Sequence, residues 1–250
     1  MLLKNKVALI TGAGSGMGKA QAVEYSNEGA KVILADINLE GAEKTAQQLR
    51  DNGGEAVAVK GNVAKKAEAE DMVNKGLEHF GHIDILSNTA GILDNYKPSL
   101  EIEEDEWDQI MGVNLKGAYL MTNAVLPQMI EKGKGTVINF ASIAGFVAGG
   151  GGAVYTPTKH GIIGYTKQLS FDYGKKGIKA NAICPGAVET AMTKEIFEEN
   201  EAIQDLLSDT PAGRAAKPEE IAYLSVFLAS DKSDFIHGAP IKIDGGWTVK

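Results

Sequence analysis

Short apolar runs alternate with longer segments of mixed polarity along the whole chain. The runs consist largely of aliphatic and β-branched residues, and they lie at Val7–Ile10, Val32–Ala35, Ala56–Val59, Ile83–Leu86, Thr136–Phe140, Ile178–Cys184 and Ile241–Ile243. A strand that is buried on both faces of a sheet is apolar at nearly every position. These runs therefore predict strands of a buried parallel sheet.

The segments between the runs have apolar positions spaced as on one face of a helix. Ala42, Ala46 and Leu49 show this spacing in the second such segment. Strand–helix alternation predicts an α/β fold, a doubly wound parallel sheet with right-handed crossovers. No linker or repeat divides the sequence, so we expect residues 1–250 to form a single domain, with Gly149–Gly152 as a mobile loop inside it.

Charge and cysteine content narrow the range of partners. The net charge is −8, and the only arginines are Arg50 and Arg214. An acidic protein repels nucleic-acid phosphates and anionic lipid, so we expect neither nucleic acid nor a membrane as partner. The sequence has no signal-peptide pattern and no apolar run long enough to span a membrane. With Cys184 as its one cysteine, the protein can form no internal disulfide, and we expect it in the cytoplasm.

The turn after the first apolar run is rich in glycine. It has the pattern T-G-x-x-x-G-x-G over Thr11–Gly18, followed by a helical segment. Glycines let the backbone approach a pyrophosphate, and a helix N-terminus offers it free N–H groups. A flexible turn without ligand is the alternative. The candidate cofactor contacts in this turn are Gly12, Ser15, Gly16, Met17 and Gly18.

The second apolar run ends in a carboxylate, Asp36. A carboxylate at this place can accept hydrogen bonds from both hydroxyls of an adenosine ribose, and it repels a 2′-phosphate. Ser15 in the glycine turn and Ile37 after Asp36 supply no basic partner for such a phosphate. The sequence therefore predicts NAD rather than NADP as cofactor, with Asp36 and Ile37 as contacts. A solvated strand end is the alternative for Asp36.

The next two strand ends add further candidate contacts. Asn62 follows the third run, where its amide can bond the adenine amino edge while Val63 packs on the ring; a plain turn asparagine is the alternative. The fourth run ends in the small residues of Asn88-Thr89-Ala90-Gly91, which let the backbone lie close to a nicotinamide ribose. We expect Asn88, Ala90 and Gly91 to contact the cofactor there.

Tyr155, Lys159 and Ser142 form the candidate catalytic group. Tyr155 and Lys159 share a face of a helix at their four-residue spacing, and Ser142 follows the fifth apolar run. A lysine cation close to the phenol is expected to lower its pKa, so Tyr155 could give a proton to a carbonyl oxygen or take one from an alcohol. Ser142 could hold that oxygen. A Tyr–Lys pair on an exposed helix is the alternative.

These motifs resemble those of the short-chain dehydrogenase/reductase family over essentially the whole chain. The matching positions are the glycine turn, Asn88-x-Ala90-Gly91, Asn114, Ser142, Tyr155-x-x-x-Lys159 and Pro185-Gly186. The resemblance implies a seven-stranded Rossmann sheet and a catalytic tetrad of Asn114, Ser142, Tyr155 and Lys159, in which the lysine also binds the nicotinamide ribose. It adds Pro185, Gly186, Val188 and Thr190 to the cofactor contacts. It further implies a homotetramer, with the helix of Tyr155 and the C-terminal segment through Trp247 at its interfaces.

The chain departs from the family pattern in four places. Asn62 stands where aspartate is common, and Thr89 replaces a common second asparagine. Pro157 lies between the tyrosine and the lysine, so we expect the catalytic helix to begin late or bend there. The Gly149–Gly152 stretch is unusually rich in glycine for the segment before the catalytic tyrosine, and no role is assigned to it.

The substrate is expected to be a neutral or apolar ketone or secondary alcohol. The loops that should bind it carry mostly apolar residues and no arginine; the candidates are Ile92, Leu93, Ile143, Phe146, Val147, Val154, Met192 and Phe197. Residues of about 187–210 are expected to form a substrate loop or lid. The function predicted is NAD-dependent hydride transfer. The alternatives are reduction of 3-oxoacyl groups on an acyl carrier protein and a catalytically silent NAD-binding protein.

Two further features are expected to carry no chemistry. His79 and His82 have a spacing that metal ligands can have, but no third ligand is near in sequence, so we expect no metal site. Cys184 ends an apolar run and is expected to be buried rather than reactive.

Overall fold

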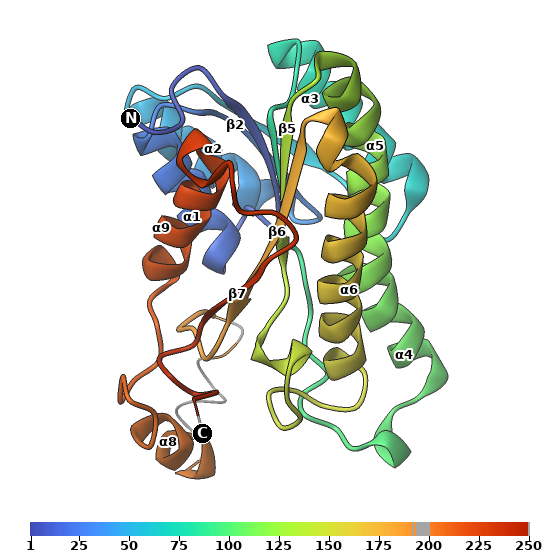
Figure 1. Ribbon diagram of the computed structural model, residues 1–250, viewed down its shortest axis with the longest axis vertical. Helices are drawn as coiled ribbons and strands as arrows, with labels where there is room; N and C mark the ends of the chain where they lie inside the picture. The colour runs from blue at the N-terminus through green and yellow to red at the C-terminus, as the bar shows by residue number, and fades with distance from the viewer. Residues whose placement is uncertain (192, 194–200, 250) are drawn as a thin grey trace.

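A computed structural model describes residues 1–191, 193 and 201–249. Within them lies one sheet of seven parallel strands in the order β3-β2-β1-β4-β5-β6-β7 (Figure 1). The strands are β1 (Val7–Thr11), β2 (Lys31–Asp36), β3 (Ala56–Lys60), β4 (Ile85–Asn88), β5 (Gly135–Phe140), β6 (Ile178–Pro185) and β7 (Pro240–Ile243). The doubly wound, seven-stranded single domain expected from the sequence is confirmed.

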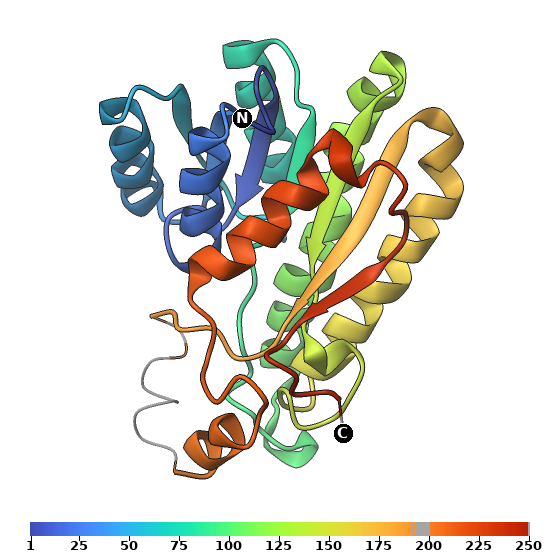
Figure 2. The same ribbon diagram turned by 60° about the vertical axis from the view of Figure 1, so that its left-hand side comes forward.

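Helices cover both faces of the sheet. One face carries α1 (Gly16–Asn27), α2 (Leu39–Asp51) and α9 (Pro218–Ala229), and Figure 2 shows α9 crossing the sheet beside α1. The other face carries α3 (Lys66–Phe80), α4 (Glu104–Met111), α5 (Gly117–Lys132) and α6 (Tyr155–Tyr173) (Figure 1). The short helix α8 (Glu201–Ser208) lies apart from both layers, near the C-terminus.

The apolar runs are explained by burial on both faces of the sheet. In β1, Ala8 and Ile10 pack into the cluster with α1, α2 and α9, whereas Val7 and Leu9 pack into the cluster on the opposite face. All four side chains have no exposed surface. Full burial of a large aliphatic side chain contributes about 1.5–3 kcal/mol, which is why these strands tolerate no polar alternation.

The strand order places a crevice at the carboxyl edge of the sheet. From β1 the chain winds outward to β2 and β3, and it then returns to form β4 on the other side of β1. At such a switch point the connections after the two neighbouring strands diverge and leave room for a ligand. The glycine turn after β1 and the loop after β4 therefore face each other.

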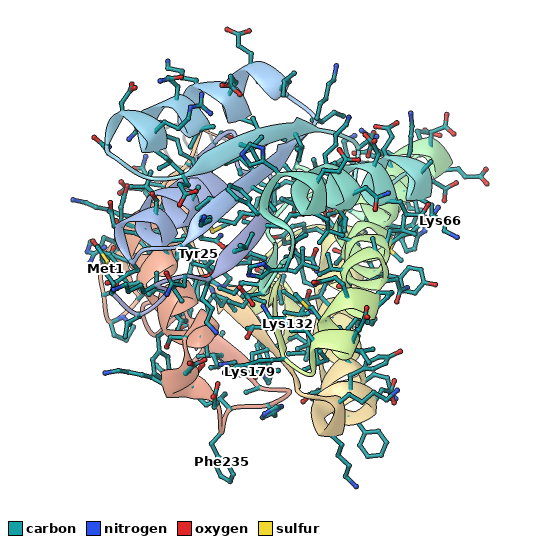
Figure 3. The ribbon with its side chains drawn as sticks, turned by 90° about the horizontal axis from the view of Figure 1, so that it is seen from above. Met1, Tyr25, Lys66, Lys132, Lys179 and Phe235 are labelled. Carbon is teal, nitrogen blue, oxygen red and sulfur yellow. The ribbon has the colours of Figure 1, made fainter. Side chains whose placement is uncertain are left out.

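The opposite, amino edge of the sheet is closed by charged side chains. Asp84, just before β4, accepts hydrogen bonds from Lys132 Nζ at 2.6 Å and from the backbone N–H of Val7 at 2.9 Å. Lys179 of β6 is buried and donates to the backbone oxygen of Ser230 at 2.7 Å. Figure 3 looks down on this edge, with Lys132 and Lys179 labelled.

The helix that carries Tyr155 begins earlier than the late start expected from Pro157. Helix α6 starts at Tyr155 itself and continues to Tyr173, with Pro157 as its third residue. A proline in the first turn loses no hydrogen bond, because the N–H groups there have no partner within the helix. The expected late start is therefore wrong.

None of the helices in the described part of the chain is long and apolar enough to cross a membrane.

Candidate active site

The glycine turn between β1 and α1 is shaped to receive a phosphate group. Gly16 has a φ of 51°, in the left-handed region that favours glycine. A Cβ atom at Gly18 would collide with the carbonyl oxygen of Gly12, so only glycine fits there. Ser15, the N-cap of α1, makes no side-chain capping bond, and the first turn of α1 holds no acidic residue. The N–H groups at the N-terminus of α1 and the positive end of its helix dipole thus face the crevice.

A cavity of about 560 Å³, called here the larger cavity, runs along the carboxyl edge of the sheet from Asp36 to Lys159. Most of the cofactor contacts expected from the sequence line it: Gly12, Ser15, Gly16, Met17, Gly18, Asp36, Ile37, Asn62, Val63, Ala90, Gly91, Tyr155, Lys159 and Thr190. Its length, its free helix N-terminus and its glycines fit a dinucleotide.

The carboxylate of Asp36 is fixed at one end of the larger cavity. Its Oδ2 accepts a hydrogen bond from Gly14 N at 2.8 Å, and its Oδ1 accepts one from Asn38 N at 2.8 Å. Among the described residues no lysine, arginine or histidine forms an ion pair with it. Asp36 therefore holds the glycine turn, with its carboxylate at the cavity wall.

A second, smaller cavity of about 130 Å³ adjoins the first, and Met17, Leu93 and Tyr155 line both. Pro185, Gly186 and Val188 line this smaller cavity, beside Ser142. The other described residues that line it are Tyr96, Ala141, Ile143, Gly149, Gly150, Ala187, Thr190, Thr193 and Trp247.

Only some of the residues that were expected to contact the substrate line the two cavities. Leu93 and Ile143 line the smaller cavity, and Ile92 lines the larger one. The rest of the described candidates line neither; these are Phe146, Val147 and Val154. Met192, Phe197 and the central part of the expected lid at 187–210 lie outside the described residues.

Asn88 is the one expected cofactor contact that lines neither cavity. Its Nδ2 donates to Asn139 Oδ1 at 2.9 Å and to Thr122 Oγ1 at 3.0 Å. The side chain is buried and turned toward β5 and α5, so it joins those elements to β4. Asn88 is the last residue of β4, whereas Ala90 and Gly91, which line the larger cavity, lie in the loop after the strand.

Tyr155, Lys159 and Ser142 come together where the two cavities meet. Tyr155 and Lys159 lie one turn apart at the start of α6, with Lys159 Nζ 5.1 Å from the centre of the Tyr155 ring. Lys159 is buried, and its Nζ donates to the carbonyl oxygen of Phe140 at 2.8 Å. Ser142 is buried at the end of β5, and its Oγ accepts a hydrogen bond from Ala144 N at 3.1 Å.

The pKa of Tyr155 differs from the value expected from the sequence. Burial raises the pKa of Tyr155 above the ordinary phenol value of 10.0; a hydrogen bond with Ser142 opposes this, and Tyr96 and Asp94 add to it. Burial also lowers the pKa of Lys159 to about 8. The expected lowering of the Tyr155 pKa is therefore wrong for this structure, because desolvation of the phenol is the largest effect on this pKa and raises it. At neutral pH the phenol holds its proton and can donate it.

Asn114 lies in a wide helical turn, Gly112–Lys116, between α4 and α5. Its Oδ1 accepts from Ile92 N at 2.8 Å, and its Nδ2 donates to the oxygen of Ile92 at 2.9 Å. The side chain also reaches Thr158 of α6, at 3.4 Å. Asn114 thus joins the loop after β4 to the helix of Tyr155, behind the wall of the larger cavity.

One wall of the larger cavity is not among the features expected from the sequence. It is formed by α4 and the turn after it, through Asp108, Gln109, Gly112 and Val113. Their spacing of three and four residues places them on one face of a helix, a signal that was present in the sequence but could not be tied to this cavity.

The two features expected to carry no chemistry can be located. His82 Nε2 lies 3.2 Å from Asp84, at the amino edge and far in sequence from the catalytic group. In the part of the chain that is described, no three His, Cys, Asp or Glu side chains are grouped to hold a metal ion. Cys184 is buried, as expected, and burial raises the pKa of its thiol to about 12.

A dinucleotide-shaped cavity at a sheet switch point, with a tyrosine and a lysine beside it, defines the class of nicotinamide-dependent oxidoreductases. A family model described as "Enoyl-(Acyl carrier protein) reductase" matches residues 12–248. The chain belongs to the short-chain dehydrogenase/reductase family. It is thus a dehydrogenase or reductase of alcohols and ketones that uses a nicotinamide cofactor.

Three relatives illustrate the range within this family. The chain is 37% identical to 3beta-hydroxysteroid dehydrogenase 2 of Eggerthella lenta over 99% of this chain and 96% of that one. It is 37% identical to the 3-oxoacyl-[acyl-carrier-protein] reductase FabG of Thermotoga maritima over the full length of both. The crystal structure of a gluconate 5-dehydrogenase from Burkholderia cenocepacia with NADP and tartrate matches with a TM-score of 0.94, at 35% identity over 99% of this chain and 97% of that one.

Proposed function

We propose that this protein transfers a hydride between NAD(H) and a neutral or apolar ketone or secondary alcohol. The observation that carries the proposal is the place of Tyr155, which lines both the dinucleotide-shaped cavity and the smaller cavity beside Ser142. The nicotinamide ring would supply or accept the hydride. The protein's own residues handle the proton and the substrate oxygen.

In ketone reduction, Ser142 holds the carbonyl oxygen by a hydrogen bond, and the protonated phenol of Tyr155 donates its proton to that oxygen. In alcohol oxidation the phenolate takes the proton back. The raised pKa of Tyr155 favours the donating form at neutral pH. Lys159 lies beside the ring and lines the larger cavity, where it can bind the ribose hydroxyls.

The preference for NAD rests on Asp36. Its carboxylate is held by two backbone N–H groups at the end of the larger cavity, and Ile37, the next residue, is 64% exposed and uncharged. A 2′-phosphate would meet a negative charge there without a cation to offset it. The gluconate 5-dehydrogenase of similar structure binds NADP, so the two cofactors must be compared directly on this protein.

The decisive measurement is kcat/KM for NADH and for NADPH with one ketone. We expect NADH to be preferred by tenfold or more. Equal use of the two cofactors, or a preference for NADPH, would contradict the assignment.

The substrate class rests on the smaller cavity. None of the described residues that line it carries a charge, and most are apolar or glycine. A carboxylate or phosphate on the substrate would lose its hydration there without a partner. We expect cyclohexanone, acetoin or a 3-oxosteroid to be reduced, and 5-ketogluconate, an anion, to be a poor substrate. A clear preference for the anion would contradict this assignment.

A second candidate is reduction of 3-oxoacyl groups on an acyl carrier protein, because the FabG relative matches over its full length. Acyl carrier proteins are acidic, and this chain has a net charge of −8. Like charges slow such an encounter. Faster turnover of a carrier-bound 3-oxoacyl thioester than of any free ketone would favour this second function.

We also propose a homotetramer, built on two apolar surfaces. Tyr119 of α5 and Phe171 of α6 are 50% and 85% exposed on one side of the molecule. Tyr223 of α9 and Phe235, which projects outward in Figure 3, are 57% and 103% exposed on another. Exposed apolar groups of this size are typical of interfaces. Light scattering on the purified protein should give four times the chain mass; a monomer would contradict the proposal.

A further inference from the structure

Asp94, in the loop after β4, is a buried carboxylate that the catalytic chemistry described above does not use. It has no exposed surface. Its Oδ2 accepts hydrogen bonds from the backbone N–H groups of Val154 at 3.0 Å and Tyr155 at 2.8 Å, and its Oδ1 accepts one from Gly152 at 2.9 Å. A buried carboxylate is costly unless it is fully bonded. Among the described residues no cation pairs with Asp94, so these backbone bonds are what holds it there.

The same carboxylate also orders its own loop. Its Oδ1 accepts a bond from Tyr96 N at 3.3 Å. Asn95 and Tyr96 both have left-handed backbones, with φ of 51° and 58°, which is unfavourable for residues other than glycine. This conformation presents Tyr96 to the smaller cavity, which Tyr155 also lines. One side chain therefore joins the two segments that flank this cavity.

Three of the glycines before α6 are explained by close approach to neighbouring groups, whereas Gly149 has nothing within 4 Å and a left-handed φ of 84°. A Cβ atom at Gly152 would lie 2.7 Å from the carboxylate of Asp94. At Gly150 it would lie 3.1 Å from Ala144 N. At Gly151 it would press into the ring of Tyr155. The glycine stretch that the sequence left without a role is thus the segment that must pass between Asp94 and the catalytic tyrosine.

We propose that Asp94 is the positioning residue of Tyr155. By accepting the N–H groups of Tyr155 and Gly152, it fixes the start of α6 and so the place of the phenol between the two cavities. Through Tyr96 it fixes the facing wall of the smaller cavity in the same step. The inference rests on the proposed function, in which Tyr155 transfers the proton.

The charge of Asp94 gives this role a signature of its own. The groups that face the phenol are Ser142, Tyr96, Asp94 and, beside the ring, Lys159. Asp94 acts to raise the pKa of Tyr155. Removal of this charge therefore lowers that pKa, and the pH dependence of both reduction and oxidation moves toward lower pH. A residue that only stabilised the fold would not shift the profile.

Two variants separate position from charge. Asp94→Asn keeps the shape, removes the charge and leaves a single acceptor oxygen for the four N–H groups. Gly152→Ala keeps the charge but pushes the backbone away from the carboxylate. The matched control is Asp105→Asn, which alters an exposed carboxylate in the first turn of α4.

The measurements are kcat and KM between pH 6 and pH 10 with the ketone or alcohol that the wild type converts fastest, and NADH binding by fluorescence. Both Asp94→Asn and Gly152→Ala should lower kcat by about tenfold to a hundredfold, as small displacements of a catalytic group do. The Kd for NADH should stay within twofold, since Asp94 does not line the larger cavity. Only Asp94→Asn should move the pH profile toward lower pH.

The inference is overturned if Asp94→Asn behaves like Asp105→Asn in kcat and pH profile, or if it loses NADH binding as strongly as turnover. Should Asp94→Asn not fold, Gly152→Ala with normal kcat overturns it, as does rapid hydrogen exchange of the Tyr155 amide in the wild type. The proposed function fails in a different way, by full turnover in Tyr155→Phe or by no turnover of any ketone or alcohol.

Discussion

The two edges of the sheet each bury an aspartate, and they satisfy it in different ways. At the amino edge Asp84 is paired with the cation of Lys132 at 2.6 Å and lies 3.2 Å from His82. At the carboxyl edge Asp94 accepts only backbone N–H groups, all from segments that surround the cavities. Asp84 thus has its charge offset by a cation and holds one backbone N–H group, that of Val7, whereas the four backbone N–H groups around Asp94 fix the path of the chain. The amino edge is thus built for stability and the carboxyl edge for precise placement.

The largest effect expected from this contrast is a fall in kcat with no loss of stability. Tyr155→Phe removes the proposed proton donor at the carboxyl edge and leaves the ring and its packing in place. We expect kcat for ketone reduction to fall by about 10²–10⁴-fold, the usual contribution of a general acid. The midpoint of thermal unfolding and the Kd for NADH should remain as in the wild type. Turnover near the wild-type level would remove Tyr155 from the chemistry.

The opposite result is expected at the amino edge. Asp84→Asn weakens the bond from Lys132 and removes the partner of its charge, so the free energy of unfolding should fall by about 1–3 kcal/mol. Urea unfolding measures this change. The kcat of the folded variant should equal that of the wild type, because the edge lies at the far end of the strands from Tyr155. A fall in kcat at unchanged stability would break the comparison.

A smaller effect is expected for Asp36→Asn, at the cofactor end of the carboxyl edge. The amide keeps one acceptor oxygen but loses the charge, so kcat/KM for NADH should fall by about tenfold, equal to about 1.4 kcal/mol. The same change removes the repulsion of a 2′-phosphate, so kcat/KM for NADPH should rise. Asp51→Asn, at the exposed end of α2, is the control and should alter neither value.

The smallest expected effect is the loss of the stability contribution of Asp84 at low pH. Burial acts to raise the pKa of Asp84, but the bonds from Lys132 and Val7 outweigh it and leave the pKa below its ordinary value of 3.8. A carboxyl with a lowered folded-state pKa contributes stability above its unfolded pKa and loses it as the pH falls through the folded value. The stability difference between wild type and Asp84→Asn should therefore be full at pH 7 and shrink below pH 3.8. A difference that stays constant down to pH 2 would contradict this.

Much of the cofactor cavity could be predicted because it depends on local sequence. The glycine turn, Asp36 and the Ala90-Gly91 pair each follow directly from a strand end, and parallel strands bring their carboxyl ends to one edge. Tyr155 and Lys159 are a single helical turn apart, so their contact is local as well. The walls from α4 and the role of Asp94 could not be predicted, because they join segments far apart in sequence.

The sequence by itself determined the class of the fold and the residue types of the proposed catalytic group, since buried strands and close-range motifs leave regular patterns of residue types. Only the tertiary structure decided the pKa values of those groups and the contacts that hold them in place. Burial raised the pKa of Tyr155 despite the nearby lysine, and Asp94 reached across about 60 residues to the amide of Tyr155. Both effects depend on desolvation and on contacts between distant segments, which no pattern along the chain records.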